Sequence, residues 1–214
     1  MLIRKTAFVL FMLLVFGILF AESSRQLDKN NEFGGYTWET SYNKGDRFYK
    51  DNGILKSIAF YDTKQKMKVA EYFYTEDFQK LKGLVHEIQF FNDQQKVTQM
   101  KFYYTKSFGE SEGYTNKNDS FYPNSDPLST EYYYTEDFSK KYGYYHSITQ
   151  FNIGHYIREW QYDYTEVWSK KIGYAKRIDH YVYIGADKKE TVTEKLYLDK
   201  DGKELKRENL ETNQ

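Results

Sequence analysis

One glycine recurs at a fixed interval along most of the chain, and an aromatic residue precedes each copy by five positions. The glycines are Gly53, Gly83, Gly113, Gly143 and Gly173, and their aromatic companions are Phe48, Phe78, Phe108, Phe138 and Trp168. The 30-residue interval needs no insertion or deletion. A strict period requires each unit to stack on its neighbour in the same way. The chain is therefore expected to form a linear array.

The columns of the repeat indicate strands. Within a unit, the aromatic residues at positions one, three and seven share parity, which places them on one face of a strand. The glycine ends a polar stretch, where it suits a left-handed turn, and a second strand follows, as in Leu84 to Phe91. Position twenty breaks the parity of that strand, which predicts a bulge or a strand end.

We therefore predict an all-β fold, an antiparallel meander of five to six β-hairpin repeats of 30 residues that forms an extended or curled sheet. The units are 42–71, 72–101, 102–131, 132–161 and 162–191, followed by a partial cap at 192–207. Helical repeats are the alternative at this period, but they would need apolar residues at three-and-four spacing and few turn residues.

The edges of the repeat carry further expectations. Both prolines of the chain fall within Ser120 to Thr130, which predicts a protruding loop or a bend there, because proline cannot donate to a strand ladder. The polar segments Glu22 to Glu32 and Arg207 to Gln214, including the tail 208–214, are expected to fray. Phe48 to Gly53 and Tyr197 to Gly202 are similar, but Tyr197 and Gly202 fall one residue short of the 30-residue frame, which predicts a sixth half-unit with a tighter turn as a cap.

The N-terminus has the pattern of a secretory signal. Arg4 and Lys5 precede an uncharged apolar stretch, and Ala21 ends a plausible cleavage site, so residues 1–21 are predicted to be a signal peptide and residues 22–41 an N-terminal segment. An uncleaved anchor is the alternative, and it would be the chain's one contact with a membrane. We expect an exported protein, located in the periplasm, on the outer surface or in the medium.

Composition narrows the classes of partner. The chain has no cysteine, which excludes disulfides and thiolate metal sites, and a cysteine-free exported protein fits a bacterial envelope. Removing residues 1–21 takes two of the 31 basic residues and leaves 29 against 31 acidic ones. That balance would not hold a polyanion, so no nucleic-acid partner is expected.

Two segments resemble a known repeat family. Phe60 to Tyr72, and Tyr197 to Lys206 with its Asp-Lys-Asp-Gly turn, are similar to the aromatic, Asp/Asn-Gly, Lys-Leu-Lys hairpins of bacterial MORN-variant repeats, also described as antitoxin-like repeats. The resemblance implies antiparallel hairpins in a meandering sheet, a place in envelope proteins and no agreed catalytic activity. A weaker resemblance is to aromatic cell-wall-binding repeats.

No motif predicts an enzyme, a cofactor or a metal site. His86 and His146 share position fifteen, two units apart, so we interpret them as marks of the repeat frame. Glu76, Glu136 and Glu166 form a column of like charges that is more typical of solvated turns than of a paired-carboxylate site. Lysines at position nine flank the same turns and would keep the hairpin tips soluble.

Aromatic residues at position two are the candidate binding site. Their side chains point away from those of positions one and three, so Phe73, Tyr103 and Tyr133 could form an outward stripe that Tyr145 extends. Rigid rings give contact area at low entropic cost. The leading hypothesis is a non-enzymatic envelope protein that binds a protein or a glycan through this face. The alternatives are a structural scaffold without a soluble ligand and an outer-membrane β-barrel.

Overall fold

The computed structural model describes residues 23–26, 31–184 and 189–210, so the predicted signal peptide lies outside the described residues. The chain divides into two compact units, residues 1–82 and 83–214. Each is an antiparallel meander, in which every strand pairs with the strand that follows it in the sequence. The predicted all-β class and meander are confirmed.

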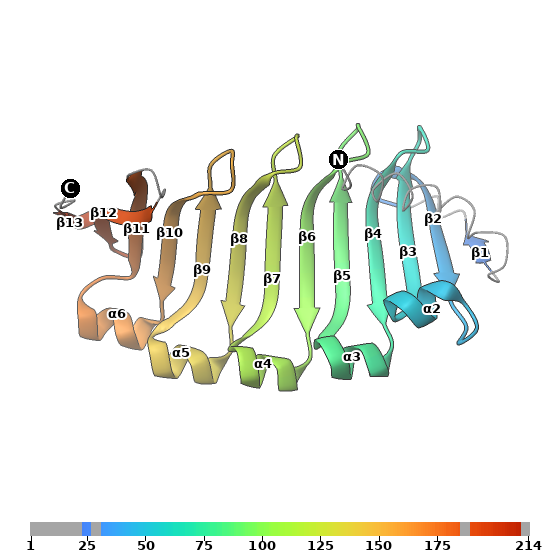
Figure 1. Ribbon diagram of the computed structural model, residues 1–214, viewed down its shortest axis with the longest axis horizontal. Helices are drawn as coiled ribbons and strands as arrows, with labels where there is room; N and C mark the ends of the chain where they lie inside the picture. The colour runs from blue at the N-terminus through green and yellow to red at the C-terminus, as the bar shows by residue number, and fades with distance from the viewer. Residues whose placement is uncertain (1–22, 27–30, 185–188, 211–214) are drawn as a thin grey trace. The chain divides into compact units, whose positions relative to one another are not determined.

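The described part of the first unit joins four strands and two short helices (Figure 1). The strands are Ser23–Gln26 (β1), Gly34–Ser41 (β2), Ile54–Asp62 (β3) and Met67–Tyr74 (β4), and the helices are Arg47–Asn52 (α2) and Glu76–Lys82 (α3). Strand β2 pairs with β3, so the sheet of this unit begins before the first predicted repeat at residue 42.

The second unit continues the same alternation of strands and helices. Its strands are Leu84–Phe91 (β5), Val97–Tyr104 (β6), Tyr114–Phe121 (β7), Pro127–Tyr134 (β8), Tyr144–Phe151 (β9), Ile157–Tyr164 (β10), Lys176–Ile184 (β11), Lys189–Leu198 (β12) and Glu204–Asn209 (β13). Its helices are Lys106–Glu112 (α4), Glu136–Tyr142 (α5) and Glu166–Ile172 (α6). In Figure 1 these helices lie along one end of the strands and the tight turns along the other.

The recurring glycine ends a helix, which corrects the predicted hairpin turn. In α5 the Thr135 hydroxyl caps the helix by accepting the Phe138 N–H, Glu136 stands in the first turn, Lys140 stands in the last, and left-handed Gly143 follows. Each feature favours a helix of this length. Position seven therefore lies on a helix and not on the strand that carries positions one and three.

The glycine is required for a second reason, which is ring packing. A Cβ on Gly53 would lie 2.3 Å from the Phe78 ring, and one on Gly143 would lie 2.5 Å from the Trp168 ring. Gly173 has the same left-handed backbone but meets nothing within 4 Å. The aromatic residue of a later helix thus occupies the space that a side chain at the preceding glycine would fill.

The charged columns of the sequence are ion pairs on the helices. Lysine and glutamate one helical turn apart pair in α5, as Glu136 with Lys140 at 2.6 Å, and in α6, as Glu166 with Lys170 at 2.6 Å. Helix α4 reverses the two charges, as Lys106 and Glu110 at 3.6 Å. These pairs are exposed, so water and salt screen them and they contribute little to stability.

Tight turns join the strands at the end opposite the helices. Asp62 Oδ1 accepts the N–H groups of Lys64 and Lys66, and Asp199 Oδ1 accepts those of Asp201 and Lys203. Gly202 is the left-handed residue of this second turn, whereas Gly53 ends a helix. The terminal segment therefore has the tighter turn that its shortened frame predicts, whereas the residues it resembles form a helix end.

Three local predictions have clear outcomes. Register shifts at Phe60/Tyr61, Phe90/Phe91 and Ser120/Phe121 confirm the bulge at position twenty. Ser120 to Thr130 is not a protruding loop, because β7 runs to Phe121 and pairs with Pro127 at the start of β8, where a missing N–H is tolerated. The predicted fraying is wrong for Ser23–Gln26 and for Arg207–Asn209, which lie in β1 and β13.

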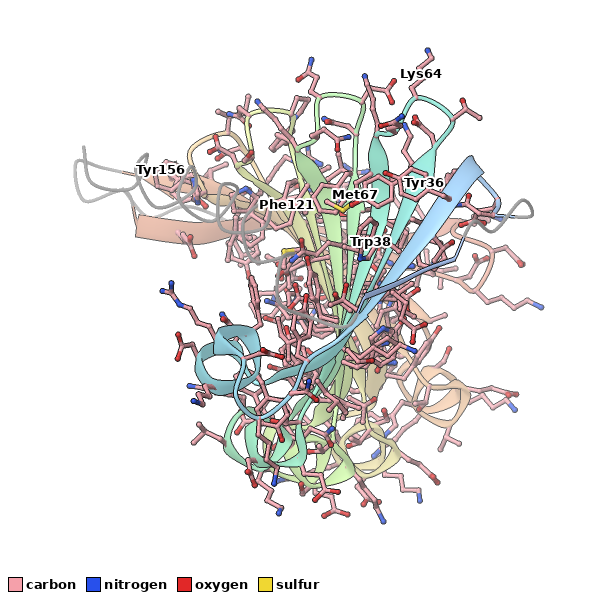
Figure 2. All side chains as sticks on the ribbon, turned by 90° about the vertical axis from the view of Figure 1, so that its right-hand side faces the viewer. Tyr36, Trp38, Lys64, Met67, Phe121 and Tyr156 are labelled. Atoms are coloured by element: carbon pink, nitrogen blue, oxygen red, sulfur yellow. The ribbon has the colours of Figure 1, made fainter. Side chains whose placement is uncertain are left out.

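Neither unit has a second layer of strands or helices over its sheet within the described residues. Figure 2 shows side chains projecting from both sides of the strands, and most strand residues are half-buried. Ring stacking and cross-strand polar pairs therefore stabilise the sheet, as the tyrosine-rich composition favours.

Candidate functional site

A row of polar and aromatic residues crosses one face of the second unit, next to the helices. The strand register places these residues side by side in the order His86, Tyr103, Asn116, Tyr133, His146, Asp163 and Lys176, one on each strand from β5 to β11. We call this surface the histidine face. Two rows of the same face follow toward the turns, and they include Asn118, Glu131 and Gln161 in the first and Ser120, Ser129 and Gln150 in the second.

His146 and Asp163 form the most buried polar contact of this face. Nδ1 of His146 lies 2.7 Å from Oδ2 of Asp163, and their side chains are 12% and 9% exposed. Asp163 also accepts a hydrogen bond from Gln161 at 2.9 Å and lies 3.7 Å from the Lys176 ammonium. Burial by itself raises the pKa of Asp163, but the hydrogen bonds from His146 and Gln161 and the charge of Lys176 hold that pKa below its ordinary value. Asp163 is thus an ionised acceptor, and Nδ1 of His146 carries the donated proton.

Glu131 completes the network on the neighbouring strand. Its Oε2 accepts hydrogen bonds from the Tyr133 hydroxyl at 2.9 Å and from Asn118 at 3.4 Å. The same oxygen lies 3.8 Å from Nε2 of His146, a distance too long for a hydrogen bond. Burial, the bond to Glu131 and nearby negative charge raise the pKa of Tyr133 to about 12, so its hydroxyl remains a donor at neutral pH.

Three of the four predicted aromatic residues lie on or beside this network. Tyr133 stacks on His146 with ring centroids 4.6 Å apart, and Tyr103 stacks on His86 at 5.4 Å. Tyr145 is the extra residue of a bulge in β9, because Tyr144 pairs with Tyr164 and His146 pairs with Asp163. Its ring lies 6.4 Å from that of His146.

The fourth predicted residue, Phe73, belongs to the first unit. It pairs with Lys56, whose ammonium lies 5.8 Å from the centre of the Phe73 ring. Within the second unit, Tyr103 and Tyr133 are separated by Asn116 on the strand between them. The predicted stripe is therefore a pair of rings flanking an amide in this unit.

Exposure distinguishes the rings of the histidine face. Tyr133 is 37% exposed and Tyr145 is 50% exposed, whereas Tyr103 is half-buried. Few rings of the unit are this accessible, and these two adjoin a buried network whose donors and acceptors are fixed. The arrangement offers apolar contact beside oriented polar groups, which is the usual composition of a binding surface.

The opposite face of the second unit has its charges paired. Cations stand over aromatic rings on neighbouring strands: Lys117 over Phe102 at 5.5 Å, Arg177 over Tyr162 at 4.5 Å and Lys206 over Tyr197 at 5.5 Å. Each cation also pairs with the acid two residues on, namely Asp119, Asp179 and Glu208. We call this surface the cation face, and its internal pairing indicates a role in stability.

Sequence reasoning missed the His146–Asp163 pair. The repeat columns predict the same role for His146 and His86, and both do stack on a tyrosine of the preceding or following strand. The signal was position two of the fifth unit, where Asp163 replaces the aromatic residue of the three preceding units. Recognising its importance required the strand register that places it beside His146.

The network is arranged for positioning. Nε2 of His146 is buried and makes no hydrogen bond to the described residues, so a bound molecule would not reach it directly. Within the described part of the chain, no group of three or more histidine, aspartate and glutamate side chains has the geometry of a metal site. The chemistry that this face offers is hydrogen bonding and ring stacking.

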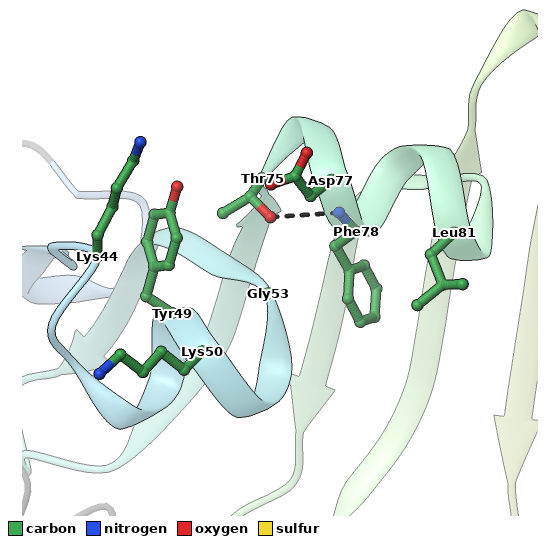
Figure 3. Close-up of a pocket in the computed structure, with 8 residues that line it drawn as sticks. All are labelled: Lys44, Tyr49, Lys50, Gly53, Thr75, Asp77, Phe78 and Leu81. Atoms are coloured by element: carbon green, nitrogen blue, oxygen red, sulfur yellow. Dashed lines mark hydrogen bonds between the residues drawn. The ribbon is translucent and has the colours of Figure 1, made fainter.

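A shallow hollow lies between the two helices of the first unit (Figure 3). It has a volume of about 430 Å³ and is lined by Lys44, Tyr49, Lys50, Gly53, Thr75, Asp77, Phe78 and Leu81. Tyr49 stands at the helix position that Gly109 and Ser139 occupy in α4 and α5, where both are buried. The mixed charges of the rim indicate no particular ligand.

Comparisons with protein-family models and with curated proteins find no match to this chain. The resemblance to MORN-variant repeats therefore stays a prediction. Among the described residues, no helix has the length and apolar character needed to cross a membrane.

Proposed function

We propose that this chain is an exported, non-enzymatic protein of a bacterial envelope that binds a protein or a glycan on the histidine face. One observation carries the proposal: Tyr133 and Tyr145 are 37% and 50% exposed beside a buried network of fixed polar groups. The proposal takes export and location from the signal-like residues 1–21 and from the absence of cysteine.

The contrast between the two faces supports ligand capture over a purely structural role. On the cation face, cations lie over rings of the neighbouring strands and pair with acids on their own strands. On the histidine face, rings remain accessible. The hydrogen bond from Tyr133 to Glu131 restricts the rotamers of Tyr133, which costs conformational entropy. A scaffold would gain nothing from this arrangement, whereas a binding surface needs rings held in place before the ligand arrives.

A matched set of variants tests the proposal. Replacing Phe73, Tyr103, Tyr133 and Tyr145 by serine should abolish retention of the protein on immobilised envelope polysaccharide or envelope protein, with the far-UV spectrum unchanged. The control is Tyr142→Ser, because Tyr142 is 46% exposed on α5 and not on the histidine face. Equal retention of the wild type and the serine variant would contradict the proposal.

The location is tested separately. Protease added to intact cells should degrade the protein if it lies on the outer surface and spare it if it lies in the periplasm, and the mature N-terminus should map to residue 22. A chain that begins at Met1 in purified envelopes would show that the signal is retained as an anchor.

A further inference from the structure

Tyr103 and Tyr133 of the histidine face each stack on a histidine, and we call these two rings the walls. His86 covers one face of Tyr103, with the rings 5.4 Å apart and 20° from parallel, and His146 covers one face of Tyr133 at 4.6 Å and 29°. Both histidines lie on the outer sides, on β5 and β9. The uncovered faces of the two tyrosines therefore look toward each other across β7.

Asn116 lies between these walls. It pairs with Tyr103 on one side and with Tyr133 on the other. Two strand spacings separate the tyrosines by about 9.5 Å, so a ring placed midway would lie about 4.8 Å from each, which is within stacking distance. Because the asparagine side chain is much shorter than a tyrosine, its amide forms the base of the space between them.

Polar groups with spare hydrogen-bonding capacity continue from this point along β7 and β8. The Asn116, Ser120 and Ser129 side chains make no hydrogen bond to any described residue, and Glu131 has Oε1 free while Oε2 binds Tyr133. Asn116 and Glu131 thus lie beside the two rings, and Ser120 and Ser129 lie farther along the same strands, toward the turns. This combination of apolar walls and a mixed polar base does not suit a purely apolar ligand, which would leave the polar groups unpaired.

We infer that the ligand of the histidine face is a neutral glycan, with one sugar ring inserted between Tyr103 and Tyr133 and its hydroxyls bound by Asn116 and Glu131. This inference rests on the proposed function. The two C–H faces of a sugar ring can pack against the two tyrosine rings. Its hydroxyl groups can both donate hydrogen bonds to Asn116 and Glu131 and accept them from Asn116. The Glu131 carboxylate disfavours acidic sugars through like-charge repulsion, whereas the charge of Asp163 is offset by Lys176.

Titration calorimetry of the full chain with defined oligosaccharides tests this inference. The neutral probes are hexamers of β-1,4-glucose, α-1,4-glucose, β-1,4-xylose and N-acetylglucosamine, and the acidic probe is a galacturonate hexamer. We expect at least one neutral probe to bind and the acidic probe not to. Tyr103→Leu should weaken binding at least tenfold, and Asn116→Leu should weaken it about fivefold, the loss of one hydrogen bond. Tyr103→Phe should bind like the wild type.

The controls separate this inference from the proposed function. Asn43→Leu, at an exposed position of the first unit, and Tyr142→Leu on α5 should leave binding unchanged. Failure of every neutral probe to bind, preference for the acidic probe, or full binding by Tyr103→Leu and Asn116→Leu would overturn the glycan assignment. If one of these outcomes were found but retention on the envelope still depended on Tyr133 and Tyr145, the proposed binding function would stand and only the glycan assignment would be lost.

Discussion

The two units differ in what they bury, although they share their alternation of strands and helices. In the described part of the first unit, the buried side chains are mainly apolar, and they are Ile54, Val69, Ala70 and Tyr74, with Asn31 and Thr75 as polar exceptions. Among the described residues of the second unit, the buried side chains are all polar or charged, and they are Glu87, Ser139, Ser147, Thr149, Asp163 and Asp179.

The difference shows that this architecture does not need a continuous apolar core. Burying a polar group costs free energy unless its partners are present, so the second unit depends on the hydrogen bonds that its buried polar groups make with one another. Tyr134 and Ser147 illustrate this, because their hydroxyls lie 2.9 Å apart and Ser147 is fully buried. The unit that carries the candidate site is thus the one stabilised by polar groups.

The largest expected effect is at Asp163. Asp163→Ala should lower the free energy of unfolding by about 3 to 5 kcal/mol, because it leaves His146 and Gln161 without their shared acceptor in a buried position. Urea denaturation measures the loss. Asp137→Ala, at an exposed position of α5, is the control and should change stability by less than about 0.5 kcal/mol. A loss below about 1 kcal/mol at Asp163 would mean that polar burial does not stabilise the second unit.

Substitutions of the recurring glycine probe a feature that both units share, the left-handed residue that ends a helix. Gly143→Ala should cost about 3 kcal/mol, because a left-handed backbone penalises any Cβ by about 1–2 kcal/mol and the Trp168 ring already fills the space. Gly53→Ala in the first unit should cost as much, since Phe78 lies equally close. Gly173→Ala keeps only the backbone penalty and is the matched control. Equal losses at Gly143 and Gly173 would show that ring packing adds nothing.

The sequence predicted the strands well and the connections poorly. Alternating aromatic positions define strands locally, and Tyr132 and Tyr133 do point to opposite faces, toward Tyr114 and His146 respectively. The helices were missed because seven residues are too few for an apolar period. Their signal was the pattern of threonine, first-turn acid, last-turn lysine and glycine, which resembles a polar turn when read without the capping roles.

The candidate site was predictable only in part. Tyr133 and Tyr145 follow from strand alternation and composition, but the bulge at Tyr145 and the contact between His146 and Asp163 depend on register. A shift of one residue would move Asp163 to the cation face. His146 and His86 occupy the same column of the repeat. They differ because Asp163 lies beside His146 on the next strand, and only the strand register shows this.

Apolar burial should matter more in the first unit. Ile54→Ala should lower the free energy of unfolding by about 2 kcal/mol, since Ile54 is 9% exposed and its removal leaves a cavity. Ile148→Ala in the second unit should cost about 1 kcal/mol or less, because Ile148 is half-buried on the histidine face. Urea denaturation of both variants gives the comparison. Equal costs would remove the distinction between the units.

The smallest effect separates two buried aspartates of the second unit by pH. The pKa of Asp163 lies below its ordinary value of 3.8, so its stabilisation is present above that value and is lost as the pH falls through the folded-state pKa. Burial raises the pKa of Asp179 above 3.8 despite the nearby Arg177, so ionised Asp179 costs stability as the pH rises. Asp163→Asn should therefore destabilise more than Asp179→Asn at pH 7, and the gap should narrow at pH 3. A gap that widens in acid would mean that the two carboxylates have exchanged roles, and that the His146 contact does not hold Asp163 ionised.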